Sequence, residues 1–172
     1  AFVFIVLILI LSFFTFAATA NRSALLKAWR SFLSSNGLTV AQREAHGFSG
    51  NTPYFLLYLN FLLNAGVFVF LIIQAFNPDH RYNNLSVFTL SMVLTAIVLL
   101  LKHVLLYVFA WLMPGLSKDI NSYNFLIIIF SCVLGFFLIP FNFLIAFAGT
   151  IEWQTFVTLW LLALSAIFVA YG

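Results

Sequence analysis

Two adjacent ionisable residues, Lys102 and His103, interrupt a long apolar run. Such side chains are costly inside a membrane, about 2.5–3.5 kcal/mol for a central lysine, and they usually face protein or water. Ser91, Thr95 and Lys102 recur at spacings of four and seven residues, which predicts one polar stripe, while His103 and Tyr107 pair at i,i+4 on an adjacent helix face. We expect this stripe to face other helices. Lys102 either carries a functional charge or, more simply, extends to the headgroups or makes a structural hydrogen bond.

A second group of polar residues consists of amides. Asn60 and Asn64 lie at i,i+4 in another apolar run and present two amides to the same side of a helix. Amides in lipid usually bond across helices, at a gain of about 0.6–2 kcal/mol, so interhelical bonding is favoured over a solute site. Gly135 and Pro140, with Asn142 just beyond, predict a kink, and broken helices do build transporter sites. A single proline without a counterpart more often only bends its helix.

The apolar runs contain no carboxylate. All four acidic residues lie in loops or at the ends of runs, namely Glu44, Asp79, Asp119 and Glu152. Ion-coupled carriers commonly use a buried carboxylate, so this chain makes a poor pump. The three histidines lie in separate segments without metal-ligand spacing, and neither a GxSxG motif nor a glycine-rich phosphate loop is present. We therefore expect no enzyme, no metal and no cofactor.

The composition places these residues in a membrane protein. The 172 residues are 65% hydrophobic and 6% charged, and a net charge of +3 is too small and scattered for nucleic-acid binding. A helix needs about 20 apolar residues to cross a bilayer. Five runs meet that length and predict one all-α polytopic domain over 1–172, with spans at 1–20, 53–76, 85–113, 124–148 and 153–172. The chain ends directly after the fifth run, where a sixth span could begin.

A short amphipathic helix is predicted between the first two spans, at 23–34, followed by a polar loop at 35–52. Its apolar side chains share one face: Leu25, Leu26, Trp29, Phe32 and Leu33. The simpler interpretation is a helix lying on anionic headgroups, and the alternative is a docking surface for a partner. The residues expected to contact the membrane surface or the partner are Arg22, Lys27, Trp29, Arg30 and Arg43.

The distribution of Lys and Arg predicts the orientation. The loops 21–52 and 114–123 hold five of these residues, whereas 77–84 holds one and 149–152 holds none. The positive-inside rule then places 21–52 and 114–123 in the cytoplasm, and 77–84 and 149–152 in the periplasm. The first run lacks the basic region of a signal peptide, so it is predicted to be retained as a span.

Several segments resemble a known family. They are "LLKAWRSFLSS", Arg43-Glu44, "FLLYLNFLLNAGVFVFLII" and above all "VLLLKHVLLYVFAWLM". Together they resemble an uncharacterised family of polytopic inner-membrane proteins of Bacteroidota, described as a domain of unknown function. The resemblance covers nearly the whole chain. It implies a bacterial cytoplasmic membrane and one further span, but no activity and no site residues.

Two functions are compatible with these features. The first is a non-enzymatic subunit or assembly partner of a larger membrane complex, such as one serving envelope export or motility. Its basis is the aromatic-rich, carboxylate-free spans and the basic helix at 23–34. The second is a small transporter or channel whose polar path runs past Lys102, His103 and Tyr107 to Asn60 and Asn64. We favour the first.

Overall fold

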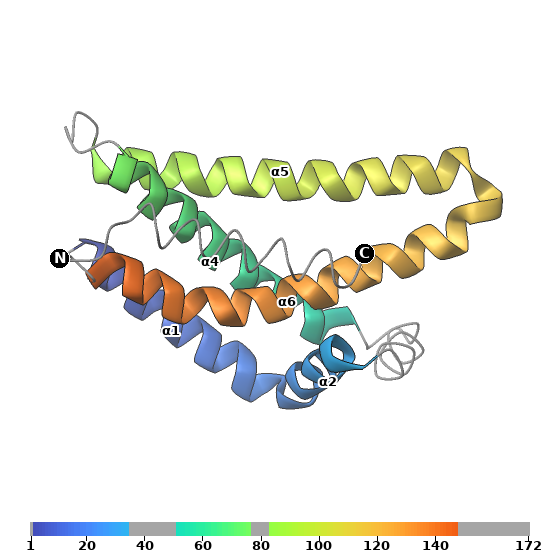
Figure 1. The fold of residues 1–172 in the computed structure, drawn as a ribbon, viewed down its shortest axis with the longest axis horizontal. Helices are drawn as coiled ribbons and strands as arrows, with labels where there is room; N and C mark the ends of the chain where they lie inside the picture. The colour runs from blue at the N-terminus through green and yellow to red at the C-terminus, as the bar shows by residue number, and fades with distance from the viewer. Residues whose placement is uncertain (1, 35–50, 77–82, 148–172) are drawn as a thin grey trace.

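Every regular element among the residues that the structure describes is a helix (Figure 1). The structure, a computed structural model, describes residues 2–34, 51–76 and 83–147. Its elements are α1 (Phe2–Ala20), α2 (Arg22–Leu33), α4 (Asn51–Phe76), α5 (Asn84–Leu112), the short 3₁₀ helix η1 (Pro114–Leu116) and α6 (Ser117–Phe147). Within this part, α1, α4, α5 and α6 are long and apolar enough to cross a membrane. The predicted all-α bundle of apolar spans is confirmed.

The helix α4 lies at the centre of the bundle and packs against α6, α5 and α1. In Figure 1, α5 runs along one side of the molecule and α1 along the other, with α4 and α6 between them. The helices α4 and α6 approach each other closely at Gly135, because a Cβ built there would lie 2.7 Å from Phe61 Cα. Glycine therefore lets these two helices pack backbone to backbone.

Small residues also shape the core at the end of the bundle where α1 meets α2. Ala17, Ala24 and Ala28 are fully buried in one cluster with Leu57 and Cys132. The Cys132 thiol donates a hydrogen bond to Tyr54 O at 3.7 Å across the α4–α6 contact. The lone cysteine therefore serves packing in this structure.

The prediction of a loop over 114–123 is wrong. The chain turns through η1 at Pro114 and is helical again from Ser117, so α6 begins seven residues before the expected start of the fourth span at 124. Proline suits the first turn of a helix because its missing N–H has no helical partner there. Asp119 lies in the first turn of α6, where its charge complements the helix dipole. The polar residues that lowered the hydropathy are thus helical.

The predicted amphipathic helix corresponds to α2, which starts one residue earlier and ends one residue earlier than expected. The chain changes direction at Asn21, whose side chain donates to Ala17 O at 3.3 Å and makes no cap for α2. The helix packs mainly on α6. Its buried face consists of Ala24, Ala28 and Ser31, not of the expected apolar face.

The expected apolar face of α2 is divided between the bundle and its surface. Leu25 and Phe32 pack against the core, whereas Leu26, Trp29 and Leu33 are exposed. Small residues allow a close approach to α6 that larger apolar residues would prevent, which is why the buried face follows the alanines. Leu26 and Leu33 remain available to lipid or to a partner.

Several predictions lie outside the described residues. They concern the fifth span at 153–172, the loop at 35–50 with Arg43, and the segments at 77–82 and 149–152. The described part therefore tests four of the five predicted spans.

At the start of α5, the Asn83 side chain caps the helix by accepting a hydrogen bond from Leu85 N at 3.2 Å.

Candidate functional site

His103 joins three helices. Its Nε2 lies 2.8 Å from the Tyr58 hydroxyl of α4, and its Nδ1 lies 2.7 Å from Asn124 Oδ1 of α6. A carboxamide oxygen can only accept, so Nδ1 carries the proton and donates to Asn124. Nε2 then accepts the hydrogen bond that the Tyr58 hydroxyl donates. The half-buried imidazole uses both of its nitrogens within the protein.

This arrangement holds helices together rather than presenting a reactive group. The Tyr58 and His103 rings also meet edge to face, with centroids 5.5 Å apart. A polar network whose members are all paired rigidifies its surroundings, and in a medium of low dielectric it is costly to break. We call Tyr58, His103 and Asn124 the three-helix joint. The Tyr58 oxygen can accept a further hydrogen bond, and the Asn124 carboxamide also has two N–H donors.

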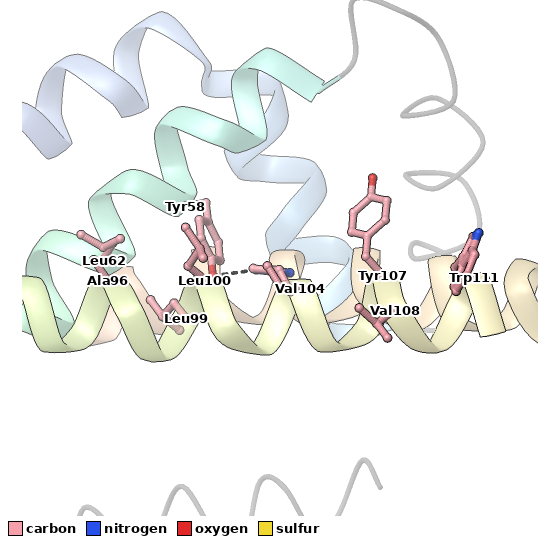
Figure 2. A pocket seen from close by; sticks show the side chains of 10 residues that line it. Tyr58, Leu62, Ala96, Leu99, Leu100, Val104, Tyr107, Val108 and Trp111 are labelled. Carbon is pink, nitrogen blue, oxygen red and sulfur yellow. Dashed lines mark hydrogen bonds between the residues drawn. The ribbon is translucent and has the colours of Figure 1, made fainter. Parts of the chain in front are cut away.

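A groove of about 630 Å³ runs along α5 beside this joint (Figure 2). Tyr58 and Leu62 of α4 line it on one side. The other lining residues come from one face of α5: Ala96, Leu99, Leu100, His103, Val104, Tyr107, Val108 and Trp111. Its volume lies within the range of ligand pockets, which are mostly apolar with a few polar groups. The groove is therefore a candidate binding site with the joint as part of its wall.

The predicted polar stripe of α5 does not act as one unit. Ser91 is buried and its hydroxyl donates to Phe88 O, while the Thr95 hydroxyl donates to Ser91 O, both at 2.8 Å. Both hydroxyls thus bond to their own helix. Lys102 is exposed, and so is Tyr107, with 70% of its surface accessible. Among the described residues of this group, only His103 makes a hydrogen bond to another helix.

The two predicted amides lie in a different network. Asn60 and Asn64 are both buried, and Asn64 Nδ2 donates to Asn60 Oδ1 at 3.0 Å. Asn142 of α6 is also buried, and its Nδ2 donates to Asn64 O at 3.0 Å. Asn142 Oδ1 has no hydrogen-bond partner among the described residues. These amides bond α4 to α6, as interhelical bonding predicts, and among the described residues no hydrogen bond joins them to His103.

Asn64→Leu should lower the free energy of unfolding by about 1–2 kcal/mol, because it removes a buried amide that Asn60 needs as a donor. Asn142→Leu should be close to neutral, because it also removes the unpaired oxygen of that side chain. Reversible unfolding in mixed micelles measures both effects. Asn121→Leu, at an exposed position of α6, is the control. Equal effects of all three substitutions would contradict an amide network.

The basic residues of α2 are only partly at the surface. Arg22 and Arg30 are exposed, whereas Lys27 is half-buried and Arg43 lies outside the described residues. The Trp29 ring packs against Phe137 of α6, with centroids 5.8 Å apart. Trp29 therefore helps to hold α2 on the bundle while leaving the two arginines free to contact headgroups or a partner.

Two residues of the joint were missed by sequence reasoning. Tyr58 lies 45 positions from His103, and Asn124 lies 21 positions away, so no local periodicity connects them. The available signal was the presence of polar side chains inside or at the ends of three predicted spans. Among the described residues, no group of three His, Cys, Asp or Glu side chains could hold a metal ion.

One protein family matches residues 3–172, and its description is "Domain of unknown function (DUF4271)". This match agrees with the resemblance found in the sequence to a family described in these terms. No curated protein and no solved structure matches the chain. The geometry of the site therefore has to carry any functional argument.

Proposed function

The chain belongs to the DUF4271 family, a domain of unknown function, and from that premise we propose that it is a non-enzymatic subunit or assembly partner of a larger membrane complex. The proposal places it in a bacterial cytoplasmic membrane. Segments 21–52 and 114–123 then lie on the cytoplasmic side, in accordance with the charge distribution. The partner would contact the bundle along α5.

The exposure of α5 is the observation that carries this proposal. None of the most apolar stretch of α5 is buried, compared with 44% of the corresponding stretch in α4 and 39% in α6. Within the described part of the chain, α5 therefore leaves most of its surface to lipid, to segments outside that part or to another protein. Val98, Leu105 and Phe109 are each about half exposed and lie with Lys102 on one face of α5, which we call the Lys102 face.

The position of Lys102 favours a protein partner over lipid on this face of α5. The chain has no carboxylate inside a predicted span, so a counter-charge at this depth has to come from another molecule. The nearer end of α5 is its C-terminus, at Leu112. Side chains on a helix tilt toward its N-terminus, so Lys102 initially points away from that nearer surface. A partner helix that carries Asp or Glu would satisfy the ammonium where it lies.

The transport alternative receives less support from the geometry. It needs a polar path that connects Lys102 and His103 with Asn60 and Asn64. His103 is instead bonded through both ring nitrogens, and the two amides bond to α6 within a separate network. Among the described residues, His103 and the two amides belong to two separate hydrogen-bond networks and do not form one path.

Purification from native membranes in mild detergent tests the proposal. We expect a partner chain in constant stoichiometry with this chain. Lys102→Met should reduce its recovery at least about tenfold, equivalent to about 1.4 kcal/mol, while Lys102→Arg should retain it. Leu100→Met changes the opposite side of α5 and is the control. Isolation of the chain alone, or unchanged recovery with Lys102→Met, would overturn the proposal.

A further inference from the structure

The helix α2 begins where a membrane span ends (Figure 1). Only Asn21 separates it from α1, whose 19 residues correspond to about 28 Å, close to the roughly 30 Å thickness of the hydrocarbon core. Ala24 and Ala28 of α2 are buried in one cluster with Ile129 and Val133, which belong to the apolar span of α6. The contact with α6 therefore holds α2 beside the bilayer, at the level where α1 ends.

The aromatic side of α2 points back toward the interior of the membrane. The helices α1 and α6 pass each other in opposite directions, because Phe4 meets Phe147 while Phe14 meets Phe136. The Trp29 ring also meets Phe136, with centroids 6.2 Å apart. Phe14 precedes the end of α1 by about 9 Å of helix, so the Trp29 side chain extends from α2 to a level inside the span.

The polar side of α2 has the opposite direction. Successive residues of an α-helix are rotated by about 100°, which places Ser23 on the side of α2 opposite Phe32, with Lys27 next to Ser23. Phe32 belongs to the aromatic side and meets Phe130 of α6. A helix that lies on a membrane surface needs this division, because one side meets hydrocarbon while the other meets water.

The outer face of α2, which is directed away from the bundle, combines two cations with two leucines. It consists of Arg22, Leu26, Arg30 and Leu33, all of them exposed. Among the described residues, Asp119 is the only carboxylate side chain, and it lies in the first turn of α6. The described parts of α1, α2 and α4 therefore offer no acidic partner to the two arginines. A lipid phosphate is an anion that a guanidinium binds through two parallel hydrogen bonds.

We propose that the outer face of α2 binds anionic phospholipids at the membrane surface. Arg22 and Arg30 pair with headgroup phosphates, while Leu26 and Leu33 lie against the acyl chains just below them. The position of α2 selects lipid as the occupant, because a helix held beside the bilayer with its aromatic side directed inward presents its outer face to the headgroup region. The site is separate from the Lys102 face of α5 and does not rest on the partner proposed there.

Native mass spectrometry of the full-length chain, equilibrated with equal amounts of phosphatidylglycerol and phosphatidylcholine, tests the preference for an anionic headgroup. We expect phosphatidylglycerol to predominate among the bound lipids, and Arg30→Gln should lower its ratio to phosphatidylcholine about fivefold. Lys102→Gln removes an exposed charge of the same sign from α5 and should leave the ratio unchanged. An unchanged ratio with Arg30→Gln would overturn the proposal, and so would equal losses in the two variants, because net charge alone would then explain the preference.

The reactivity of introduced cysteines distinguishes lipid from a protein partner on the outer face. In phosphatidylglycerol nanodiscs, Leu26→Cys should react with a water-soluble maleimide at least tenfold more slowly than Ser23→Cys. Both positions are exposed on the protein and lie within one turn of α2, so their surroundings decide the difference. The unmodified chain, whose Cys132 is buried, gives the background rate. Equal rates would place the outer face in water, as a docking surface for a soluble protein requires, and would overturn the proposal.

Discussion

Gly135→Val should lower the free energy of unfolding by about 3 kcal/mol. Even a Cβ at this position would lie 2.7 Å from Phe61 Cα and 3.1 Å from Phe61 N. These are backbone atoms of α4, so no rotation of a side chain can relieve the overlap. The two helices have to separate, and the buried contacts on either side of Gly135 weaken with them.

Reversible unfolding in mixed micelles measures the free energy of unfolding of the unmodified chain and of the Gly135→Val variant. Gly115→Val provides the control, because no atom lies within 4 Å of a Cβ built at Gly115. Gly66→Val is an intermediate case, since its added atoms meet the flexible side chain of Met92, which can move. A result in which Gly115→Val costs as much as Gly135→Val would mean that the close approach of α4 and α6 does not limit stability.

Hydropathy predicted the long helices because the bilayer requires uninterrupted apolar runs. The span expected at 85–113 is α5 (Asn84–Leu112), and the run at 1–20 is α1 (Phe2–Ala20). In each case the limits of the apolar run coincide with the limits of the helix. The prediction succeeds here because the backbone in lipid must satisfy its own hydrogen bonds.

Hydropathy failed where a helix continues beyond the apolar run. The start of α6 (Ser117–Phe147) is polar, so the sequence predicted a loop, although the backbone is helical there. Helical hydrogen bonds do not depend on the polarity of the side chains.

The packing of α2 was missed for a related reason. Its periodicity marks an apolar face, whereas the contact with α6 depends on how closely Ala24 and Ala28 allow the backbones to approach.

The site was predicted in part, because sequence identifies polar residues in a span but not their partners. Lys102 and His103 were both marked by their cost in lipid, yet adjacent residues on a helix point about 100° apart, and only His103 faces α4 and α6. The contact with Tyr58 depends on where α4 and α5 cross. Neither periodicity nor composition determines that crossing point.

His103→Phe should lower the free energy of unfolding by about 2 kcal/mol. Phenylalanine preserves the ring that meets Tyr58, but it removes both hydrogen bonds of the imidazole. The Tyr58 hydroxyl and the Asn124 amide then remain without their partner in a partly buried site, and unpaired buried polar groups cost about 1–3 kcal/mol. The loss should exceed the roughly 0.6 kcal/mol typical of one hydrogen bond between membrane helices, because two bonds to two helices are removed together.

A double-mutant cycle separates the Tyr58 bond from the rest of this effect. Tyr58→Phe alone should cost about 1 kcal/mol, and it should cost much less in a chain that already carries His103→Phe, because the acceptor is then absent. Tyr107→Phe removes a hydroxyl from an exposed position of α5 and should be nearly neutral in lipid-free detergent. If Tyr58→Phe and Tyr107→Phe have equal effects, or if the two substitutions in the cycle are additive, the hydroxyl does not hold α4 to α5. The contact between α4 and α5 would then depend on its apolar side chains.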